Sequence, residues 1–320
     1  MMQPVYINHI TSIHADPVSE ERPYLSAREP DYKSIITNAV LRRRMSRIIK
    51  MGVACGLECI SSLPSEKVNA IITATGLGCL ADTEKFLNTV IENEEQLLNP
   101  TPFIQSTFNT VGAQIALIRQ IHAYNMTYVH RGLSFESALL DGMMRIWEGD
   151  ENVLVGAMDE ITPASHAIQQ RLGLLKGIPA GEGAQFFLLG QQPSESTLAE
   201  ITGISTFRHA DSATDVAVHI QHFLQKHLSD SNQIDWFVTG KNGNGKEDAI
   251  YTDLEKSLFP AAKYSTFKDE CGEYPTAVAF AVWKVARAFG EAPCSEQTAL
   301  IYNHFHSINH SLILIRKRQW

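Results

Sequence analysis

The sequence predicts an α/β fold built in layers, with two halves of similar order that each hold a mixed, mostly parallel sheet covered by helices. Short apolar runs of strand length alternate with longer stretches whose apolar residues recur at helical spacing. This order begins near residue 5 and starts again after residue 190. Crossover helices favour parallel pairing because they return the chain to the same end of the sheet. We therefore expect residues 1–190 and 191–320 to form two halves of one compact unit.

The first half is predicted to hold five strands separated by helices. Alternating residues indicate a strand over 5–9, and a loop rich in Pro, Glu and Ser follows over 11–33. Residues 68–74 form a nearly continuous apolar run that ends at Gly76 and Gly78, which is typical of a buried strand. The two prolines of residues 99–102 predict a turn. The other expected strands cover 126–129, 153–157 and 184–190, and the expected helices cover 43–61, 82–98, 107–124 and 138–147.

The second half repeats this alternation. A long alternating strand is expected over 199–207, followed by a helix over 215–228. Residues 276–289 are rich in small and apolar side chains, which predicts a buried helix. The remaining strands are expected over 236–239, 264–267, 299–305 and 312–315, with a helix over 248–259.

The stretch from 124 to 160 predicts a sharp turn between a strand and a helix, with Gly132 at the turn. We call this turn the elbow. Ser134 is placed to cap the helix that follows, and Gly149 ends it. A turn at a helix N-terminus favours a thiolate or an oxyanion, because backbone N–H groups and the helix dipole point at it. Enzymes that place a nucleophile there use Ser or Cys. The turn therefore has the geometry for acyl chemistry but lacks an attacking atom.

Composition restricts the possible partners. The net charge of -8 argues against a nucleic-acid partner, because binding phosphates needs a basic surface. The sequence contains no run of about 18 apolar residues, so we expect no membrane span. The N-terminus has no signal-peptide pattern. The five cysteines, Cys55, Cys59, Cys79, Cys271 and Cys294, form no CxxC pair, which fits reduced, mostly buried thiols of a cytoplasmic protein.

The motifs along the chain resemble those of the β-ketoacyl synthase family, which has a thiolase-like fold. Residues 147–150 and 156–160 match the family's "rrGd" turn and the strand ending in "GGaE". Residues 74–78, 102–109, 182–184 and 303–314 resemble its "GsGiGG", "PFfvPstiiN", "GDGAg" and "FGFGGTNgslil" segments in the same order. The resemblance implies a duplicated α/β/α/β/α arrangement. Counting back from Gly149, Gly132 stands where the family has its catalytic Cys.

The resemblance also implies that the family's two catalytic histidines are replaced. In the segment that matches the "HGT.tp.gD" loop, Lys241 takes the place of the first His. In the segment that matches "K...GH", Lys268 is retained and Glu273 replaces the second His. Glycine cannot carry an acyl group, and an ionised Glu would repel a developing enolate. We expect either an ion pair between Lys241 and Glu273 or two exposed loop charges.

Other residues are weaker candidates for chemistry. Ser134 is better explained as a helix cap, and Cys271 as a buried small residue, although the nearby Lys268 can activate a thiol. The histidines His304, His306 and His310 have no carboxylate or Cys placed nearby in sequence, so no metal site is expected, and no cofactor motif is present. Phe305 matches the family's gating Phe.

Ketosynthase-like chains without the Cys are chain-length factors, which pair with an active ketosynthase and shape a shared acyl tunnel. The resemblance implies this role here, in a heterodimer that also meets acyl carrier protein, and the trimmed loops are most similar to those of aryl polyene and flexirubin-type pathways. Chain-length factors of aromatic polyketide systems carry Gln at the elbow, whereas this chain carries Gly132. The resemblance implies tunnel residues Phe305, Asn109, Met126 and Tyr128 and interface residues Gln114, Leu117, Ile118 and Ile121, each of which is otherwise an ordinary core residue.

Two other functions remain open at this point. One is an active acyl-transfer enzyme of the 3-oxoacyl synthase type that uses Cys271 or a nucleophile from the substrate. The other is a homodimeric scaffold that binds acyl carrier protein without a ketosynthase partner.

Overall fold

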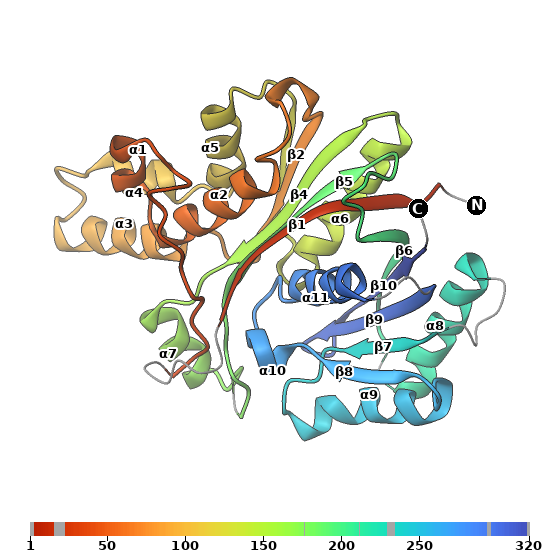
Figure 1. Ribbon diagram of the computed structural model, residues 1–320. Helices are drawn as coiled ribbons and strands as arrows, with labels where there is room; N and C mark the ends of the chain where they lie inside the picture. Colours follow the sequence, from red (N-terminus) through yellow and green to blue (C-terminus); the bar gives the residue numbers. More distant parts are fainter. Residues whose placement is uncertain are drawn as a thin grey trace.

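The computed structural model describes residues 3–15, 23–175, 177–210, 212–228, 234–292 and 296–318. Its ten strands form one sheet in the order β3-β2-β4-β5-β1-β6-β10-β9-β7-β8. Figure 1 shows this sheet running through the molecule. The strands are β1 (Val5–His14), β2 (Ala70–Ala74), β3 (Tyr124–Tyr128), β4 (Asn152–Asp159), β5 (Gly183–Gly190), β6 (Ala199–Arg208), β7 (Trp236–Thr239), β8 (Lys263–Thr266), β9 (Gln297–Phe305) and β10 (Asn309–Lys317).

The sheet consists of two blocks of five strands with the same internal order. The first block reads 3-2-4-5-1, and the second reads 8-7-9-10-6, which is the same order when β6 is counted as its first strand. The blocks meet where Val5, Tyr6 and Ile7 of β1 pair with Ile201, Glu200 and Ala199 of β6. The boundary expected after residue 190 falls between β5 and β6, and we keep the division into two halves as a proposal.

The sheet is mixed, but the expectation that it is mostly parallel is wrong. Among the described strands, β2 pairs in parallel with β3 and β4, and β7 with β8 and β9. The other five pairings, β1–β5, β1–β6, β4–β5, β6–β10 and β9–β10, are antiparallel. Alternation along the sequence predicts crossovers but does not specify which strands become neighbours in the middle of the sheet, and those neighbours are antiparallel.

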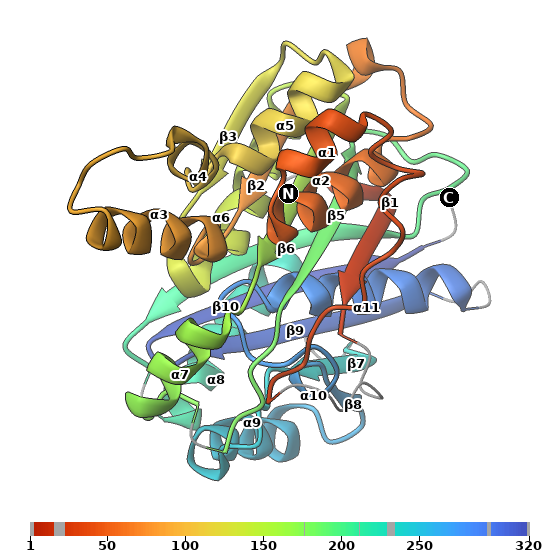
Figure 2. The same cartoon turned by 90° about the vertical axis from the view of Figure 1, so that its left-hand side faces the viewer.

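Helices cover the sheet in three layers, which Figures 1 and 2 show from two sides. α6 and α11 pack in the middle, between the inner faces of the two blocks, in one large core cluster. α2 and α5 pack on the outer face of the first block, and α8 and α9 on that of the second. The helices are α1 (Ala39–Arg44), α2 (Arg47–Cys59), α3 (Leu80–Glu92), α4 (Pro100–Gln105), α5 (Thr110–Arg119), α6 (Ser134–Trp147), α7 (Pro163–Arg171), α8 (Ala213–His227), α9 (Gly245–Leu258), α10 (Lys268–Cys271) and α11 (Val278–Glu291).

Local sequence explains where several helices begin. The Thr162 side chain accepts from the N–H of Ser165 while the Ser165 side chain accepts from the N–H of Thr162, a capping box that starts α7. Ser212 caps α8, and Asn244 caps α9. The strands β4 and β5 are almost wholly buried because helices cover both of their faces, which explains their nearly continuous apolar runs.

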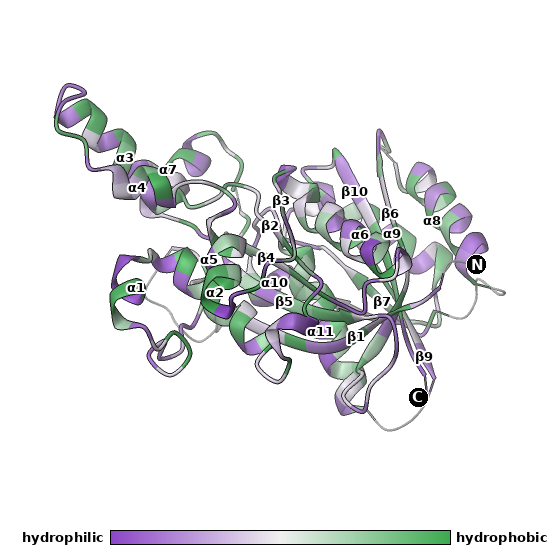
Figure 3. Cartoon of the chain, turned by 90° about the horizontal axis from the view of Figure 1, so that it is seen from above, coloured by the Kyte–Doolittle hydropathy of each residue, from purple (hydrophilic) through white to green (hydrophobic). Residues whose placement is uncertain are grey.

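Several expected boundaries move. β1 continues to His14, so the loop expected from residue 11 starts later. The turn expected over 99–102 is the start of α4, and the expected helix over 107–124 ends at Arg119. The strand expected to be buried at 126–129 is β3, which lies at the sheet edge with its first three side chains exposed. α3 and α4 pack on each other and project from the body (Figure 3).

Candidate functional site

The predicted elbow lies between β3 and α6. Arg131 has a left-handed backbone with φ of 52°, and a 3-10 turn over Arg131–Leu133 leads into the first turn of α6. Ser134 does not cap the helix in the usual way. Its Oγ accepts from the His130 N–H (2.8 Å) and donates to the Arg131 carbonyl (2.7 Å), which fixes the turn. Gly132 therefore sits buried beside the N-terminus of α6.

The ring of Phe305 fills the space that an elbow side chain would occupy. A Cβ built on Gly132 would lie 2.3 Å from Cγ, 2.4 Å from Cδ1 and 2.5 Å from Cβ of Phe305. Cβ atoms in proteins essentially never approach other atoms this closely, so any residue other than glycine requires Phe305 to move. The residue predicted to be a gate is therefore in direct contact with the residue at the nucleophile position.

Glu273 is held in a buried cluster next to this elbow region. Lys268 Nζ donates to Glu273 Oε2 (2.8 Å) and to the His304 carbonyl (3.3 Å). Asn242 Nδ2 donates to the same Glu273 oxygen (3.0 Å). The side chains of Lys268 and Glu273 are only 1% and 8% exposed, so each charge depends on the other for compensation.

The expected ion pair between Lys241 and Glu273 is wrong, and so is the alternative that both are exposed. Lys241 Nζ pairs with Glu255 on α9 at 2.7 Å. The next residue, Asn242, reaches Glu273 instead. Lys241 therefore lies outside the cluster that holds the retained Lys268.

The three histidines within residues 303–314 each lie against an aromatic ring. The His304 ring stacks on Tyr251 with centroids 4.7 Å apart, and burial, assisted by the Lys268 charge, lowers the pKa of His304 to about 3. The Tyr302 hydroxyl and His310 Nδ1 are 3.0 Å apart. No group of three or more His, Cys, Asp or Glu side chains with metal-binding geometry occurs among the described residues.

The thiols have no activating environment in the part of the chain that the structure describes. Cys271 is buried, and burial raises the pKa of its thiol well above the usual range despite the nearby Lys268. Cys55, Cys59 and Cys79 are buried too, and burial likewise raises their pKa values. Cys294 lies outside the described residues. A protonated thiol is a poor nucleophile, so the geometry of Cys271 does not favour acyl transfer at this sulfur.

Asp159 is a buried organising residue that the sequence analysis did not single out. Its Oδ1 accepts from Thr75 and from the N–H groups of Gly76 and Leu77. Its Oδ2 accepts from both the N–H and the hydroxyl of Thr276. Asp159 thus ties the end of β4 to the turn after β2 and to the segment before α11. The sequence feature that could have indicated this role is the position of Asp159, an acidic residue at the end of an apolar strand.

Glu136 is a second buried acid outside the predictions. It lies in the first turn of α6, is 1% exposed, and burial raises its pKa to about 7 even though Ser311 lies beside it. Neither carboxylate oxygen has a hydrogen-bond partner within normal geometry among the described residues. The sequence feature that could have indicated this buried acid is the charged side chain of Glu136 at a position where the helix faces the core.

Apart from Phe305, which lies on β9 against Gly132, the residues expected at a tunnel or an interface lie on β3 or on and beside α5 in the first block. On β3, Met126 is 41% exposed and Tyr128 is half-buried. On α5, Leu117 is 65% exposed, Gln114 and Ile118 are half-buried, and the exposed Asn109 precedes the helix. Ile121 is buried in the core of this half. Ile121 is therefore a core residue, while the others keep accessible surface on β3 or on and beside α5.

Comparison with known proteins agrees with this architecture. The sequence profile described as "Beta-ketoacyl synthase, N-terminal domain" matches residues 18–232, well over half of the chain. The chain therefore belongs to the β-ketoacyl synthase family. No curated protein matches the sequence.

Solved structures share its fold over the whole chain. "The ishigamide ketosynthase/chain length factor" is 16% identical, with 99% of this chain and 100% of that chain aligned at a TM-score of 0.82. A ketosynthase (ApeO) in complex with its chain length factor (ApeC) from Xenorhabdus doucetiae is 13% identical, with 98% of each chain aligned at 0.75. A β-ketoacyl synthase from Burkholderia phymatum STM815 is 14% identical, with 100% of each chain aligned at 0.74. These matches confirm the predicted thiolase-like fold class. In addition, no helix among the described residues has the length and apolar character needed to span a bilayer.

Proposed function

We propose that this chain is a non-catalytic ketosynthase-like subunit, a chain-length factor, that pairs with an active β-ketoacyl synthase and shapes an acyl tunnel. The contact between Gly132 and Phe305 carries the proposal. A ketosynthase tethers its acyl chain to a sulfur at the elbow. Here the elbow has no side chain, and an aromatic ring occupies the space where a sulfur would lie.

The cluster of Lys268, Glu273 and Asn242 supports the same role. Decarboxylative condensation develops negative charge, which hydrogen-bond donors or cations at the site must stabilise. Here the carboxylate of Glu273 already takes up the donors of Lys268 and Asn242. His304 is neutral at physiological pH and stacks on Tyr251, and its ring faces the outer core. This arrangement stabilises the fold but offers few hydrogen-bond donors or positive charges to stabilise an enolate.

The edge strand β3 supports pairing with a second chain. Among the described strands it has one hydrogen-bonded neighbour, β2, so it forms an edge of the sheet, and Met126 on it is exposed. The exposed Leu117 of α5 lies in the same half. We place the ketosynthase partner on this edge, with Asn109, Met126, Tyr128 and Phe305 toward the shared tunnel. Acyl carrier protein would deliver the chain to the complex, in a pathway of the aryl polyene type.

Co-purification tests the pairing. The chain is co-expressed with the ketosynthase encoded beside it, and we expect a stable 1:1 complex that elongates acyl-carrier-protein thioesters. A homodimer that binds acyl carrier protein but not the ketosynthase would favour the scaffold function instead.

Intact-mass analysis tests the lack of catalysis. The purified chain is incubated with acyl-carrier-protein thioesters, and we expect no covalent acyl adduct. The variant Gly132→Cys should restore no condensation either, because the cluster of Lys268 and Glu273 remains unchanged. A covalent adduct on the unmodified chain, or elongation by this variant alone, would overturn the proposal.

A further inference from the structure

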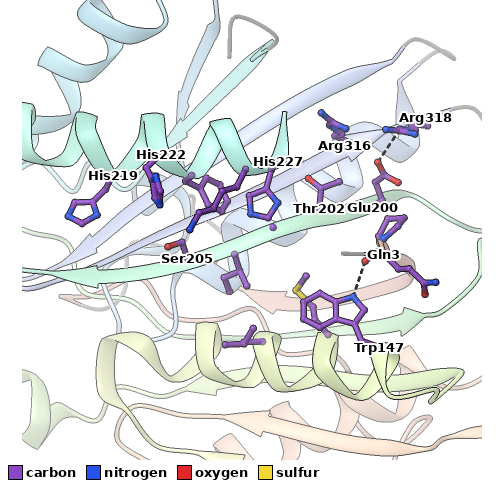
Figure 4. A pocket seen from close by; sticks show the side chains of 17 residues that line it. Gln3, Trp147, Glu200, Thr202, Ser205, His219, His222, His227, Arg316 and Arg318 are labelled. Carbon is purple, nitrogen blue, oxygen red and sulfur yellow. Dashed lines mark hydrogen bonds and ion pairs between the residues drawn. The ribbon is translucent and has the colours of Figure 1, made fainter. Parts of the chain in front are cut away.

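A cavity of about 720 Å³ lies on the side of the molecule where β6 parts from β1. β1 pairs with β6 only as far as Ile201, so from Thr202 onward no described strand pairs with the edge of β6 that faces away from β10, and the His227 ring lies against Gly203. Figure 4 shows the cavity between α6, α8 and the end of β10. It meets the C-terminal half of α6, whereas the elbow lies before its N-terminus, so the cavity is separate from the site described above.

The cavity has an apolar part and a cationic part. Met143 and Trp147 of α6 and Phe223 of α8 supply apolar and aromatic surface. Lys226, Arg316 and Arg318 supply three positive charges against the single carboxylate of Glu200. This local excess of positive charge occurs in a chain whose net charge is -8. A pocket of this size with apolar walls and a few convergent polar groups is typical of a small-molecule site.

The two arginines differ in how their charges are compensated. Arg318 Nε lies 3.1 Å from Glu200 Oε1. Arg316 forms no ion pair within 4.0 Å with any residue that the structure describes, although it stands opposite Glu200 in the register of β6 and β10. Burial and the neighbouring Arg318 lower the pKa of Arg316 because both disfavour its charge, and their effect exceeds the opposite effect of the Glu200 and Glu296 carboxylates. A half-buried guanidinium beside another cation is the group whose charge an anion would best balance.

We propose that this cavity binds an amphipathic monocarboxylate, with its carboxylate on Arg316 and its apolar chain along Met143, Trp147 and Phe223, while Lys226 adds positive charge to the same cavity. A monoanion fits better than a phosphate dianion for two reasons. The Glu200 carboxylate lies in the same cavity, and the C-terminal end of α8, with its partial negative charge, faces it through Lys226 and His227. The assignment goes beyond the proposed function and does not depend on the ketosynthase partner.

Isothermal titration calorimetry of the full chain with octanoate tests the proposal. We expect one octanoate per chain, no measurable heat with acetate, and binding of octanol about tenfold weaker than that of octanoate, the loss of one charge-assisted hydrogen-bonded pair. The variant Arg316→Gln should weaken octanoate binding by about tenfold or more while leaving octanol binding unchanged. The matched control Arg287→Gln, an exposed arginine of α11, should bind octanoate like the unmodified chain.

Lys226→Gln, at an exposed position of α8, serves as a second variant because it is expected to fold even if Arg316→Gln does not. It should weaken octanoate binding severalfold. Equal affinity for octanol and octanoate, no binding of octanoate, tighter binding of octyl phosphate, or unchanged affinity in both cavity variants would overturn the assignment. Because no partner is present in this experiment, its result is independent of the co-purification test above.

Discussion

At the scale of single residues, a glycine and a phenylalanine from distant parts of the chain determine the state of the elbow. Counting back from Gly149 puts Gly132 at the nucleophile position, and the family resemblance of residues 303–314 implies that Phe305 is a gate. Their contact was not predictable, because nothing in the sequence gives the distance between two segments that are far apart along the chain. The expected partner of Glu273 was wrong by one residue along the chain, since Asn242 contacts Glu273 and Lys241 pairs with Glu255.

The contact predicts a stability effect. Gly132→Ala should lower the free energy of unfolding by about 1–3 kcal/mol, because the added methyl group forces Phe305 out of place. Adding Phe305→Ala should remove that penalty, which gives a coupling energy of at least about 1 kcal/mol in a double-mutant cycle. Urea unfolding measures both. Gly245→Ala is the matched control, since a Cβ there meets nothing within 4 Å. If Gly132→Ala were as stable as the control Gly245→Ala, Phe305 would be free to move.

The buried Glu136 predicts a pH effect. Its pKa is raised to about 7 in the folded chain, so the folded state holds its proton more tightly than the unfolded state does. Stability should therefore fall as pH rises from about 4.5 to about 7, by roughly 3 kcal/mol for this group. Glu136→Gln should raise stability at pH 8 and leave it nearly unchanged at pH 4.5, measured by urea unfolding at both values. Glu195→Gln, at an exposed loop position, should change neither. A Glu136→Gln variant with no gain at pH 8 would contradict the raised pKa.

At the scale of elements, the sequence predicted most strands and helices and failed where tertiary context decides. Two prolines suggested a turn at 99–102, yet Pro100 and Pro102 lie in the first turn of α4, where a missing N–H costs little and Asn99 caps the helix. The apolar run of β3 suggested a buried strand. In the structure β3 is an exposed edge strand. The prediction failed because an apolar run does not distinguish a strand covered by its own chain from an exposed strand at the edge of a sheet.

The exposed edge leads to a prediction about assembly. Met126→Asp should weaken the complex with the ketosynthase at least tenfold, since it puts a charge at the proposed interface on β3. It should leave the stability of the isolated chain unchanged, because the side chain is 41% exposed there. Val218→Asp on the outer face of α8, where the residue is 62% exposed, is the control and should bind normally. Surface plasmon resonance measures the affinity. Unchanged binding by Met126→Asp would place the interface elsewhere.

At the scale of the whole molecule, two blocks of strands with one topology share a central core. The repetition of strand–helix order was visible in the sequence, but the strand order was not, because it depends on which neighbours the sheet brings together. The core cluster in the middle joins Phe135 and Leu139 of α6 with Phe280 and Val285 of α11. Each block therefore covers the inner face of the other.

This shared core predicts that the two halves unfold together. Residues 1–190 expressed alone would expose the inner face of their sheet and α6, which is apolar surface that a soluble domain cannot leave uncovered. We expect either half alone to be aggregated or unfolded by circular dichroism, and the two halves co-expressed to form a soluble pair. Urea unfolding of the whole chain, followed by tryptophan fluorescence and by circular dichroism, should give coincident transitions, because Trp147 and Trp236 lie in different halves. A half that folds alone, or two separate transitions, would mean that the blocks are independent domains and that α6 and α11 are not needed to stabilise each other.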